Sequence, residues 1–303
     1  MTYKNHFEYG RLSTDENTFI SQCGLMSRNA KSPKIEAIWA AQAIQRNAAG
    51  LKINLCLSGG IDSECMLEAF LAAHVEFEIF ILKFKDDLNY FDIQTNLNKC
   101  RSLKLPYKIV ELDIMHFFES GMCLQVAEKY NCQSPQLAVH LWFLEQLDGV
   151  PVLSGNPIAP IWLNDSWYFL GMPGELHCAY FNFFQTNQRQ GVPWFFIYTP
   201  ELIASFFALN CMQPYLQKNI KNPELYTYGE KCRSYFEGGF SAQPRADKFT
   251  GFELVKNAYD RQYNTKHGDA FNKLFRWPLE EMFPFPETYI QLVPSQYFLS
   301  SLE

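Results

Sequence analysis

Residues 53–63 read Ile-Asn-Leu-Cys-Leu-Ser-Gly-Gly-Ile-Asp-Ser, an apolar run that leads into two glycines and then into polar side chains. Glycine allows backbone angles that other residues resist and lets the main chain approach a ligand closely. A strand that turns in this way into a helix directs several amide groups, and the positive end of the helix dipole, toward one concavity. The sequence therefore predicts a phosphate-binding loop at residues 58–63.

The side chains of this loop suit the same ligand. Ser58 and Ser63 supply hydroxyl donors. Asp62 would be repelled by phosphates unless Mg²⁺ stood between them, so we expect it to be a metal ligand. The loop matches neither Gly-x-x-x-x-Gly-Lys-Ser/Thr nor Gly-x-Gly-x-x-Gly. An ordinary strand-to-helix turn with packing glycines is the alternative, but a position after the first strand of an open sheet favours a ligand site.

Short apolar runs and helical patterns alternate around this loop, which is typical of parallel strands joined by crossover helices. We expect four strands, at residues 53–57, 78–84, 107–112 and 150–153. Helices are predicted at residues 63–73 and 91–103, and a further helix begins at Ser134-Pro135. The predicted fold class is α/β, with an open, mostly parallel, doubly wound sheet.

We expect the chain to divide into three parts. Residues 1–50 contain an irregular arm, to about residue 34, and then a helix whose apolar positions are Ile35, Ile38, Trp39 and Ala43. Residues 51–160 form the α/β core that carries the loop. Residues 161–303 form an aromatic-rich, mostly helical region that packs on the core, lies on the substrate side and ends in a proline-rich tail from residue 277.

Composition limits the classes of function. A net charge of −6 gives no general electrostatic footprint for nucleic acid, so no such partner is expected. Nine cysteines without a Cys-x-x-Cys pair indicate reduced thiols rather than disulfides or a zinc cage. Without a signal-peptide pattern or an apolar run of about 18 residues, we expect a cytoplasmic protein with no membrane partner. The six histidines show no metal or catalytic spacing and are expected at surface or core positions.

The hexapeptide at residues 58–63 resembles the Ser-Gly-Gly-x-Asp-Ser loop of the N-type ATP pyrophosphatases, the PP-loop superfamily. This group includes asparagine synthetase, β-lactam synthetase, NAD synthetase, GMP synthetase and tRNA-modifying thiolases. The resemblance implies an adenine nucleotide α-hydrolase-like fold, ATP and Mg²⁺ as cofactors, and a loop that holds pyrophosphate. It also implies that the end of the second strand, here Leu82, Lys83 and Phe84, offers backbone groups to the adenine.

A later segment is similar to the asparagine synthetases, in which a Lys-x-x-x-Arg helix precedes an Arg-x-Lys-x-x-Phe turn. Here Lys231 and Arg233 are two residues apart, and Arg245 and Lys248 three apart, so the order agrees but the spacing does not fully match. The resemblance makes Lys248 the lysine that neutralises charge as pyrophosphate departs. A solvated basic turn is the alternative. A looser likeness covers residues 191–206, where an apolar loop leads into a helix.

The fourth strand departs from that family. Its members carry Gly-Asp-Gly-x-Asp-Glu there, whereas this chain has Leu-Ser-Gly-Asn-Pro-Ile at residues 153–158. Gly155 is retained, and Asn156 offers a neutral oxygen to the metal in place of the first aspartate. No glutamate follows nearby. Asp165 and Glu175, in the loop after the strand, are the candidates for the acid, although such residues are more commonly surface carboxylates.

The predicted reaction has two steps. A substrate carboxylate attacks the α phosphorus of ATP, giving an acyl-adenylate and pyrophosphate, and an amine then displaces AMP to form an amide. Glutamine-dependent relatives have a cysteine after the initiator Met, where this chain has Thr2, so we expect no glutaminase domain here. The nucleophile is then free ammonia, an amine, or ammonia from a separate partner protein. The aromatic residues from Trp162 to Phe184 are expected to shape the pocket of the small-molecule acceptor.

These expectations define one set of site residues and two alternatives. The catalytic residues are Asp62 and Lys248, and the metal ligands are Asp62 and Asn156. The nucleotide-binding residues are Leu57, Ser58, Gly59, Gly60, Ile61, Asp62, Ser63, Leu82, Lys83, Phe84, Gly155 and Lys248. One alternative is adenylation of a nucleobase or nucleoside carbonyl for amination or thiolation. The other is a nucleotide-binding module without catalysis.

Overall fold

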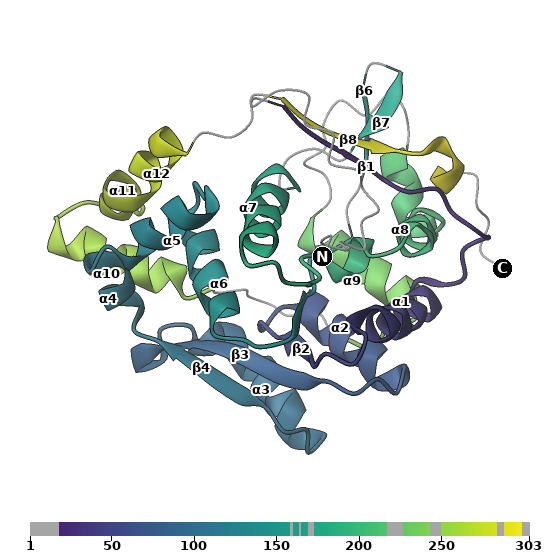
Figure 1. Cartoon of the computed structure of the whole chain (residues 1–303), viewed down its shortest axis with the longest axis horizontal. Coiled ribbons are helices and arrows are strands. Elements are labelled where there is room, and N and C mark those ends of the chain that lie inside the picture. Colours follow the sequence, from purple (N-terminus) through teal and green to yellow (C-terminus); the bar gives the residue numbers. More distant parts are fainter. Residues whose placement is uncertain are drawn as a thin grey trace.

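A parallel four-stranded sheet forms the base of the molecule (Figure 1). The computed structural model describes residues 18–157, 160–163, 165–168, 173–216, 227–242, 250–283 and 288–298. The strands are β2 (Ile53–Cys56), β3 (Glu78–Phe84), β4 (Lys108–Leu112) and β5 (Val150–Leu153), in the order β4-β3-β2-β5. These bounds confirm the four predicted strands to within a residue at each end.

The strand order reverses beside β2. The chain moves outward from β2 to β3 and β4, and β5 then returns to pair with the other side of β2. Open α/β sheets bind ligands at such a point, beyond the carboxyl ends of the strands. The parallel α/β sheet is therefore confirmed, while the closer likeness to adenine nucleotide α-hydrolases stays a prediction.

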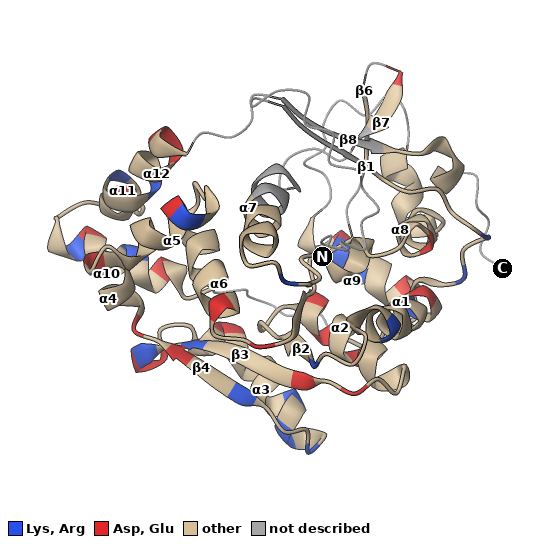
Figure 2. Ribbon diagram, viewed as in Figure 1, with Lys and Arg blue, Asp and Glu red and all other residues tan. Residues whose placement is uncertain are grey.

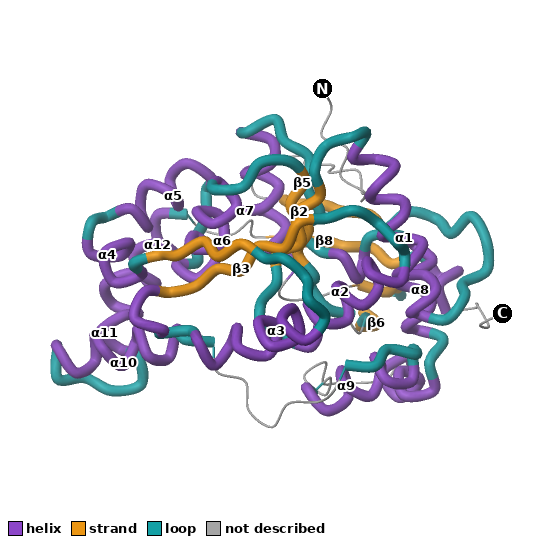
Figure 3. The backbone as a smooth tube through the Cα atoms, turned by 90° about the horizontal axis from the view of Figure 1, so that it is seen from below, coloured by secondary structure: helices purple, strands orange, loops and turns teal. Residues whose placement is uncertain are grey.

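Helices cover both faces of this sheet, with α5 and α6 on one side and α3 on the other in Figure 3. The core on one face contains residues of α1 (Pro33–Ala48), α2 (Ile61–Ala72) and α3 (Tyr90–Ser102). The core on the opposite face contains residues of α4 (Ile114–Glu119), α5 (Met122–Tyr130) and α6 (Pro135–Glu145). Both faces of the central strand β2 are therefore buried, which explains its apolar run, whereas the edge strand β4 is largely exposed.

Helix α1 forms where predicted, and Ile38 and Ala43 pack against the core as expected, but the other two predicted apolar positions face outward. Ile35 and Trp39 are 41% and 37% exposed, while the alanines of α1 and Ile44 are turned into the core. Small side chains allow α1 to lie close to its neighbours, and the Arg28 guanidinium covers the Trp39 ring at 4.3 Å. Helical spacing alone could not separate the two faces, because both carry apolar residues.

The rim of the parallel sheet carries charges of both signs. Figure 2 shows acidic and basic residues interspersed on β3, β4 and α3. Lys108 pairs with Glu78 at 2.7 Å across neighbouring strands, and Lys85 pairs with Asp113 at 2.6 Å. These pairs are largely exposed, so each contributes little to stability.

A second sheet lies on the far side of the molecule from the first (Figure 1). Its order is β1-β8-β7-β6, with strands β1 (Thr18–Gln22), β8 (Thr288–Val293), β7 (Ser166–Tyr168) and β6 (Ile161–Leu163). β1 and β8 are parallel, and the Tyr297 hydroxyl donates to the Gly24 carbonyl nearby. The predicted irregular arm is therefore wrong at β1, because β8 from the proline-rich tail supplies the neighbouring strand that makes this segment extended.

Beyond the parallel sheet the described part of the chain is mostly helical, as predicted, apart from β6, β7 and β8. The helices are α7 (Pro173–Thr186), α8 (Pro200–Phe207), α9 (Tyr228–Glu237), α10 (Phe252–Gln262), α11 (Asp269–Phe271) and α12 (Trp277–Met282). A π-helical segment, η5 (Asn272–Arg276), joins α11 to α12. Short 3-10 helices are η1 (Lys85–Asp87), η2 (Phe195–Ile197), η3 (Asn210–Leu216) and η6 (Ser295–Phe298). Among the described residues, no helix has the length and apolar character needed to cross a membrane.

Candidate functional site

A cavity of about 310 Å³ opens where the strand order reverses, and we call it the sheet-edge cavity. Residues that follow β2, the end of β3 and the loop after β5 form one wall. Of the predicted site residues, the structure brings together Leu57, Ser58, Asp62, Leu82, Phe84, Gly155 and Asn156 on this wall. Gly59, Gly60, Ile61, Ser63 and Lys83 do not line it, and Lys248 lies outside the described residues.

Hydrogen bonds within the loop fix its shape. The Ser63 hydroxyl donates to the Ser58 carbonyl at 2.8 Å and lies 3.0 Å from the Gly60 carbonyl. The Gly60 amide in turn donates to the Ser58 hydroxyl at 3.2 Å. Ser63 is fully buried, whereas Ser58 is exposed and lines the cavity. Ser63 therefore holds the loop from within, and Ser58 is the hydroxyl that a ligand meets.

Asn96 of α3 supports this loop and was missed by the sequence analysis. Its side-chain amide donates to the Ser58 carbonyl and, at 2.8 Å, to the Ser63 hydroxyl. It is fully buried beside Ile93 and Leu97 on the inner face of α3. A polar residue on the apolar face of a helix was the available signal, because such a side chain needs a specific partner.

The loop glycines also have a packing role. A Cβ atom on Gly59 would lie 0.9 Å from the Asp92 carbonyl oxygen in the first turn of α3. A Cβ atom on Gly155 would lie 1.7 Å from Trp194 Cδ1, and Gly155 has a φ of +57°. Close packing alone requires both glycines, so they do not by themselves indicate a ligand.

The Asp62 carboxylate is held by α9. Lys231 Nζ donates to Oδ2 at 2.8 Å, and the Tyr235 hydroxyl donates to Oδ1 at 2.8 Å. Lys231 and Tyr235 are four residues apart and therefore lie on one face of α9. The sequence drew attention to Lys231 but not to Tyr235. The pair joins α9 to the loop, although 169 residues separate Lys231 from Asp62.

The residues around Asp62 fit a Mg²⁺ ion that arrives with phosphates. An ionised carboxylate offers about four acceptor positions, so each Asp62 oxygen retains one beside its present donor. Asp92 and Asn156 line the same cavity. No group of three or more His, Cys, Asp or Glu residues in the described part of the chain is arranged to hold a metal by itself. Mg²⁺ commonly uses one or two carboxylates and completes its shell with phosphates and water.

Asn89 occupies the backbone groups that the resemblance assigned to adenine. Its Oδ1 accepts from the Phe84 amide at 2.7 Å, and its Nδ2 donates to the Leu82 carbonyl at 3.0 Å. The side chain is 4% exposed, and Gly251 leaves just enough room for it, since a Cβ there would lie 2.6 Å from Asn89 Cβ. A side-chain amide presents an acceptor beside a donor, as the edge of adenine does. A base that uses Leu82 and Phe84 must therefore displace Asn89.

His140 and Tyr180 line the helical wall opposite the strands, with the Tyr180 hydroxyl 3.4 Å from His140 Nδ1. His140 was expected at an ordinary surface or core position, and its place on the cavity wall was missed. Tyr180 belongs to the aromatic stretch expected to shape an acceptor pocket. Phe183 and Phe184 from the same stretch are core residues, so much of that aromatic content serves packing instead.

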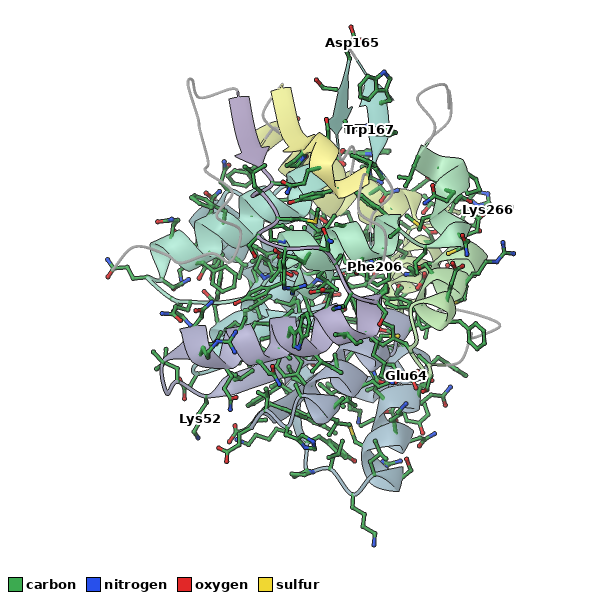
Figure 4. All side chains as sticks on the ribbon, turned by 90° about the vertical axis from the view of Figure 1, so that its right-hand side faces the viewer. Lys52, Glu64, Asp165, Trp167, Phe206 and Lys266 are labelled. Carbon is green, nitrogen blue, oxygen red and sulfur yellow. The ribbon has the colours of Figure 1, made fainter. Side chains whose placement is uncertain are left out.

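Asp165 does not supply an acid to the cavity. It is exposed at the turn between β6 and β7, and Figure 4 shows it at the far end of the molecule from Glu64 of α2. Asp165 is thus a surface carboxylate, the more common of the two roles considered for it, because the chain after β5 leads into the second sheet. The side chain of Glu175 lies outside the described residues. The carboxylates that line the cavity in the described chain are Asp62 and Asp92.

Cys56 also lines the cavity but is not an activated thiol. Burial raises the pKa of Cys56 to about 12, although the Val152 backbone and Arg189 act in the opposite direction. The thiol is therefore protonated at neutral pH, and a thiol in this state is a poor nucleophile. The described cysteines are reduced, as the sequence predicted.

Comparisons with known proteins do not identify a family for this chain. No model of a known protein family matches the sequence, and no curated protein matches it significantly. The residues that line the cavity therefore carry the functional argument.

Proposed function

We propose that the protein binds ATP in the sheet-edge cavity and transfers AMP to a substrate carboxylate, releasing pyrophosphate, before an amine displaces AMP to form an amide. One observation carries this proposal. The loop at residues 58–63 joins β2 to α2 at the reversal of strand order, and Ser58 and Asp62 line one cavity with Gly155 and Asn156. That arrangement suits a phosphate chain at the N-terminus of α2.

The residues divide the work of binding and charge stabilisation. Ser58 contacts the phosphates near the N-terminus of α2, and Asp62 would hold Mg²⁺, which supplies neutralisation of the triphosphate charge when bound. Lys231, whose Nζ is 2.8 Å from Asp62, provides a fixed positive charge beside the leaving pyrophosphate. Lys248 stays a predicted second cation at this position. Thr250, two residues further along, lines the cavity.

Residues on the helical wall of the cavity serve the second step, in which the amine displaces AMP. His140 lines the cavity beside Tyr180 and takes the proton that the attacking amine must lose as the amide forms. This role predicts that replacing His140 by Asn slows amide formation more than acyl-adenylate formation. Single-turnover measurements of the two steps, made over a range of pH, test it. Equal slowing of both steps would assign His140 to ground-state binding.

Exchange of labelled pyrophosphate into ATP tests the first step. We expect exchange that depends on an acceptor acid, found by screening small carboxylic acids. Asp62→Asn should reduce exchange by about 10²-fold, the usual effect of removing one group that stabilises transition-state charge. Glu68→Gln is the matched control, because Glu68 is also on α2 but pairs with Lys34. Normal exchange by the Asp62→Asn variant would remove the central assignment.

A second candidate, a nucleotide-binding module without turnover, is favoured by the pairing of the Asp62 carboxylate with Lys231 and Tyr235, which occupies part of the proposed metal ligand. It predicts ATP binding without exchange for any acceptor. Adenylation of a nucleobase carbonyl is tested by including nucleobases and nucleosides in the screen. The raised pKa of Cys56 opposes the thiolation form of that reaction.

A further inference from the structure

A second cavity, of about 270 Å³, adjoins the first. It lies between the N-terminus of α6, helix α10 and the π-helical segment η5, and we call it the α6–α10 cavity. Its polar lining residues are Gln133, Gln136, Lys256, Asn272, Arg276 and Glu280. Gln136 and Phe252 line both cavities, so the two share part of their walls.

Two residues that line this cavity each carry a buried polar atom with no hydrogen-bond partner in the protein. Gln133 is 8% exposed, and its Nε2 is a buried donor without an acceptor. The Oδ1 atom of Asn272, the first residue of η5, is a buried acceptor without a donor. Buried polar groups are nearly always paired, so these two call for a partner from outside the chain. π-Helical turns of this kind are frequent at functional sites.

The charges around the cavity favour an anion. Lys256 and Arg276 line it against one carboxylate, Glu280, which accepts from Arg276 Nε at 2.7 Å. The Lys256 ammonium also lies 5.9 Å from the Phe271 ring centre, which positions it along the wall. One unit of positive charge is therefore left over at the wall.

Helix α6 adds to this positive potential. Its N-terminus, with Ser134 as the cap and Pro135 following, forms part of the wall. Its other end is neutralised, because Arg189 donates to the Leu144 and Leu147 carbonyls at 3.0 and 2.6 Å. The positive end of the helix dipole thus faces the same space as the Gln133 amide.

We propose that the α6–α10 cavity binds the anionic group, a carboxylate or a phosphate, of a small molecule that also carries a hydroxyl or amine. The anion accepts from Gln133 Nε2 and is attracted by Lys256 and Arg276, and the hydroxyl or amine donates to Asn272 Oδ1. The identity of this ligand rests on the proposed function. It is the acceptor itself, with its reacting carboxylate in the sheet-edge cavity and its second anionic group in the α6–α10 cavity.

Calorimetric titration of the full chain without ATP tests the site. The probes are malate, which carries carboxylates and a hydroxyl, and inorganic phosphate, and their relative affinity identifies which anion the cavity takes. We expect one-to-one binding of at least one probe. The double variant Lys256→Met, Arg276→Gln should weaken it by at least about tenfold, since two positive charges at the wall are removed. Met keeps the apolar stem that packs near Phe271.

Matched controls use neighbouring cations that do not line the cavity. Lys273→Met is on the same π-helical segment, and Arg261→Gln is on α10. Both should bind the probes as the unaltered chain does. Gln133→Leu should also weaken binding while the protein stays folded. Binding of neither probe, or equal binding by the double variant and the unaltered chain, overturns the proposal.

ATP titrations of the same proteins separate this proposal from the proposed function. The double variant should bind ATP normally, while Asp62→Asn should lose ATP affinity and retain the probe. If the unaltered chain binds the probe but not ATP, the anion site stands and the proposed function fails. If it binds ATP but neither probe, the α6–α10 cavity is a solvent pocket and the proposed function is unaffected.

Discussion

The two adjoining cavities differ in charge. The sheet-edge cavity is lined by Asp62 and Asp92, and none of its described lining residues is a Lys or Arg. The α6–α10 cavity has two cations against one carboxylate. A phosphate chain in the first must bring its own cation or draw on Lys231 behind the wall, whereas the second attracts an anion directly. Similar size and shared residues therefore do not imply the same ligand.

The cavities also differ in how their polar groups are paired. In the sheet-edge cavity, Asn89 and Asp62 are bonded to neighbouring protein groups on both sides. In the α6–α10 cavity, Gln133 Nε2 and Asn272 Oδ1 have no protein partner. The first wall is thus fixed by its own contacts, and a ligand must compete with them. The second offers a donor and an acceptor at once.

The largest effect is expected from Gly59→Ala, which tests how rigid the first wall is. Its Cβ would meet the Asp92 carbonyl, so the loop or α3 must move, and we expect the free energy of unfolding to fall by about 3 kcal/mol. Urea denaturation measures this. Gly229→Ala on α9 is the control, because its Cβ would meet nothing closer than 3.8 Å. A loss below about 1 kcal/mol would show that the loop adapts easily.

Removal of Mg²⁺ should weaken ligand binding in the sheet-edge cavity but not in the α6–α10 cavity. ATP binding places phosphates beside Asp62 and Asp92, so EDTA should weaken it by at least about tenfold, or about 1.4 kcal/mol. Binding of malate or phosphate in the α6–α10 cavity should not change. Calorimetry with and without EDTA tests both statements. If EDTA abolished both ATP binding and anion binding, the proposed difference in charge between the two cavities would be contradicted.

Local pattern and long-range contact explain what the sequence predicted. The four strands and the loop at residues 58–63 were predictable because apolar runs, glycines and helix starts are local signals. The pairing of β1 with β8 joins opposite ends of the chain, and the contact of Lys231 with Asp62 spans 169 residues. No local pattern contains either. Asn89 and Asn96 were missed for the same reason, since their roles depend on groups brought close by folding.

Asn89→Ala tests whether the Asn89 side-chain amide occupies the backbone groups that an adenine base would use. The change frees the Phe84 amide and the Leu82 carbonyl while retaining the Cβ that packs on Gly251. ATP affinity relative to GTP should rise by about fivefold, because about 1 kcal/mol is no longer needed to displace the amide. Asn98→Ala, on the exposed side of α3, is the control. An unchanged ratio would mean that the base does not use this strand end.

Gln133→Leu should stabilise the protein by about 1 kcal/mol, because it removes a buried donor that has no partner. Thermal and urea unfolding without added anion measure this. Saturating malate or phosphate should reverse the order, since only the unaltered chain gains stability from the bound anion. Gln125→Leu, at an exposed position on α5 that lines neither cavity, is the comparison. A destabilised Gln133→Leu protein would indicate that the amide already has a partner, such as water.

The smallest expected effect is the contribution of Asp260 to the stability of the protein at low pH. Burial of Asp260 acts to raise its pKa, but hydrogen bonds from the Gly268 amide at 2.5 Å, the Thr265 hydroxyl at 2.8 Å and the Ala270 amide at 3.2 Å outweigh it and lower the pKa. A carboxyl whose pKa is lower in the folded state stabilises fully above its unfolded pKa, near 4, and loses that contribution as pH falls further. The unfolding free energy of the unaltered chain should therefore decline below about pH 4 more steeply than that of Asp260→Asn. Urea midpoints at several pH values measure this, with Asp269→Asn at an exposed position as control. The loop that Asp260 holds leads into α11 and η5, which form part of the wall of the α6–α10 cavity. If the unaltered chain and Asp260→Asn lost stability in parallel as the pH falls, other contacts would hold this wall.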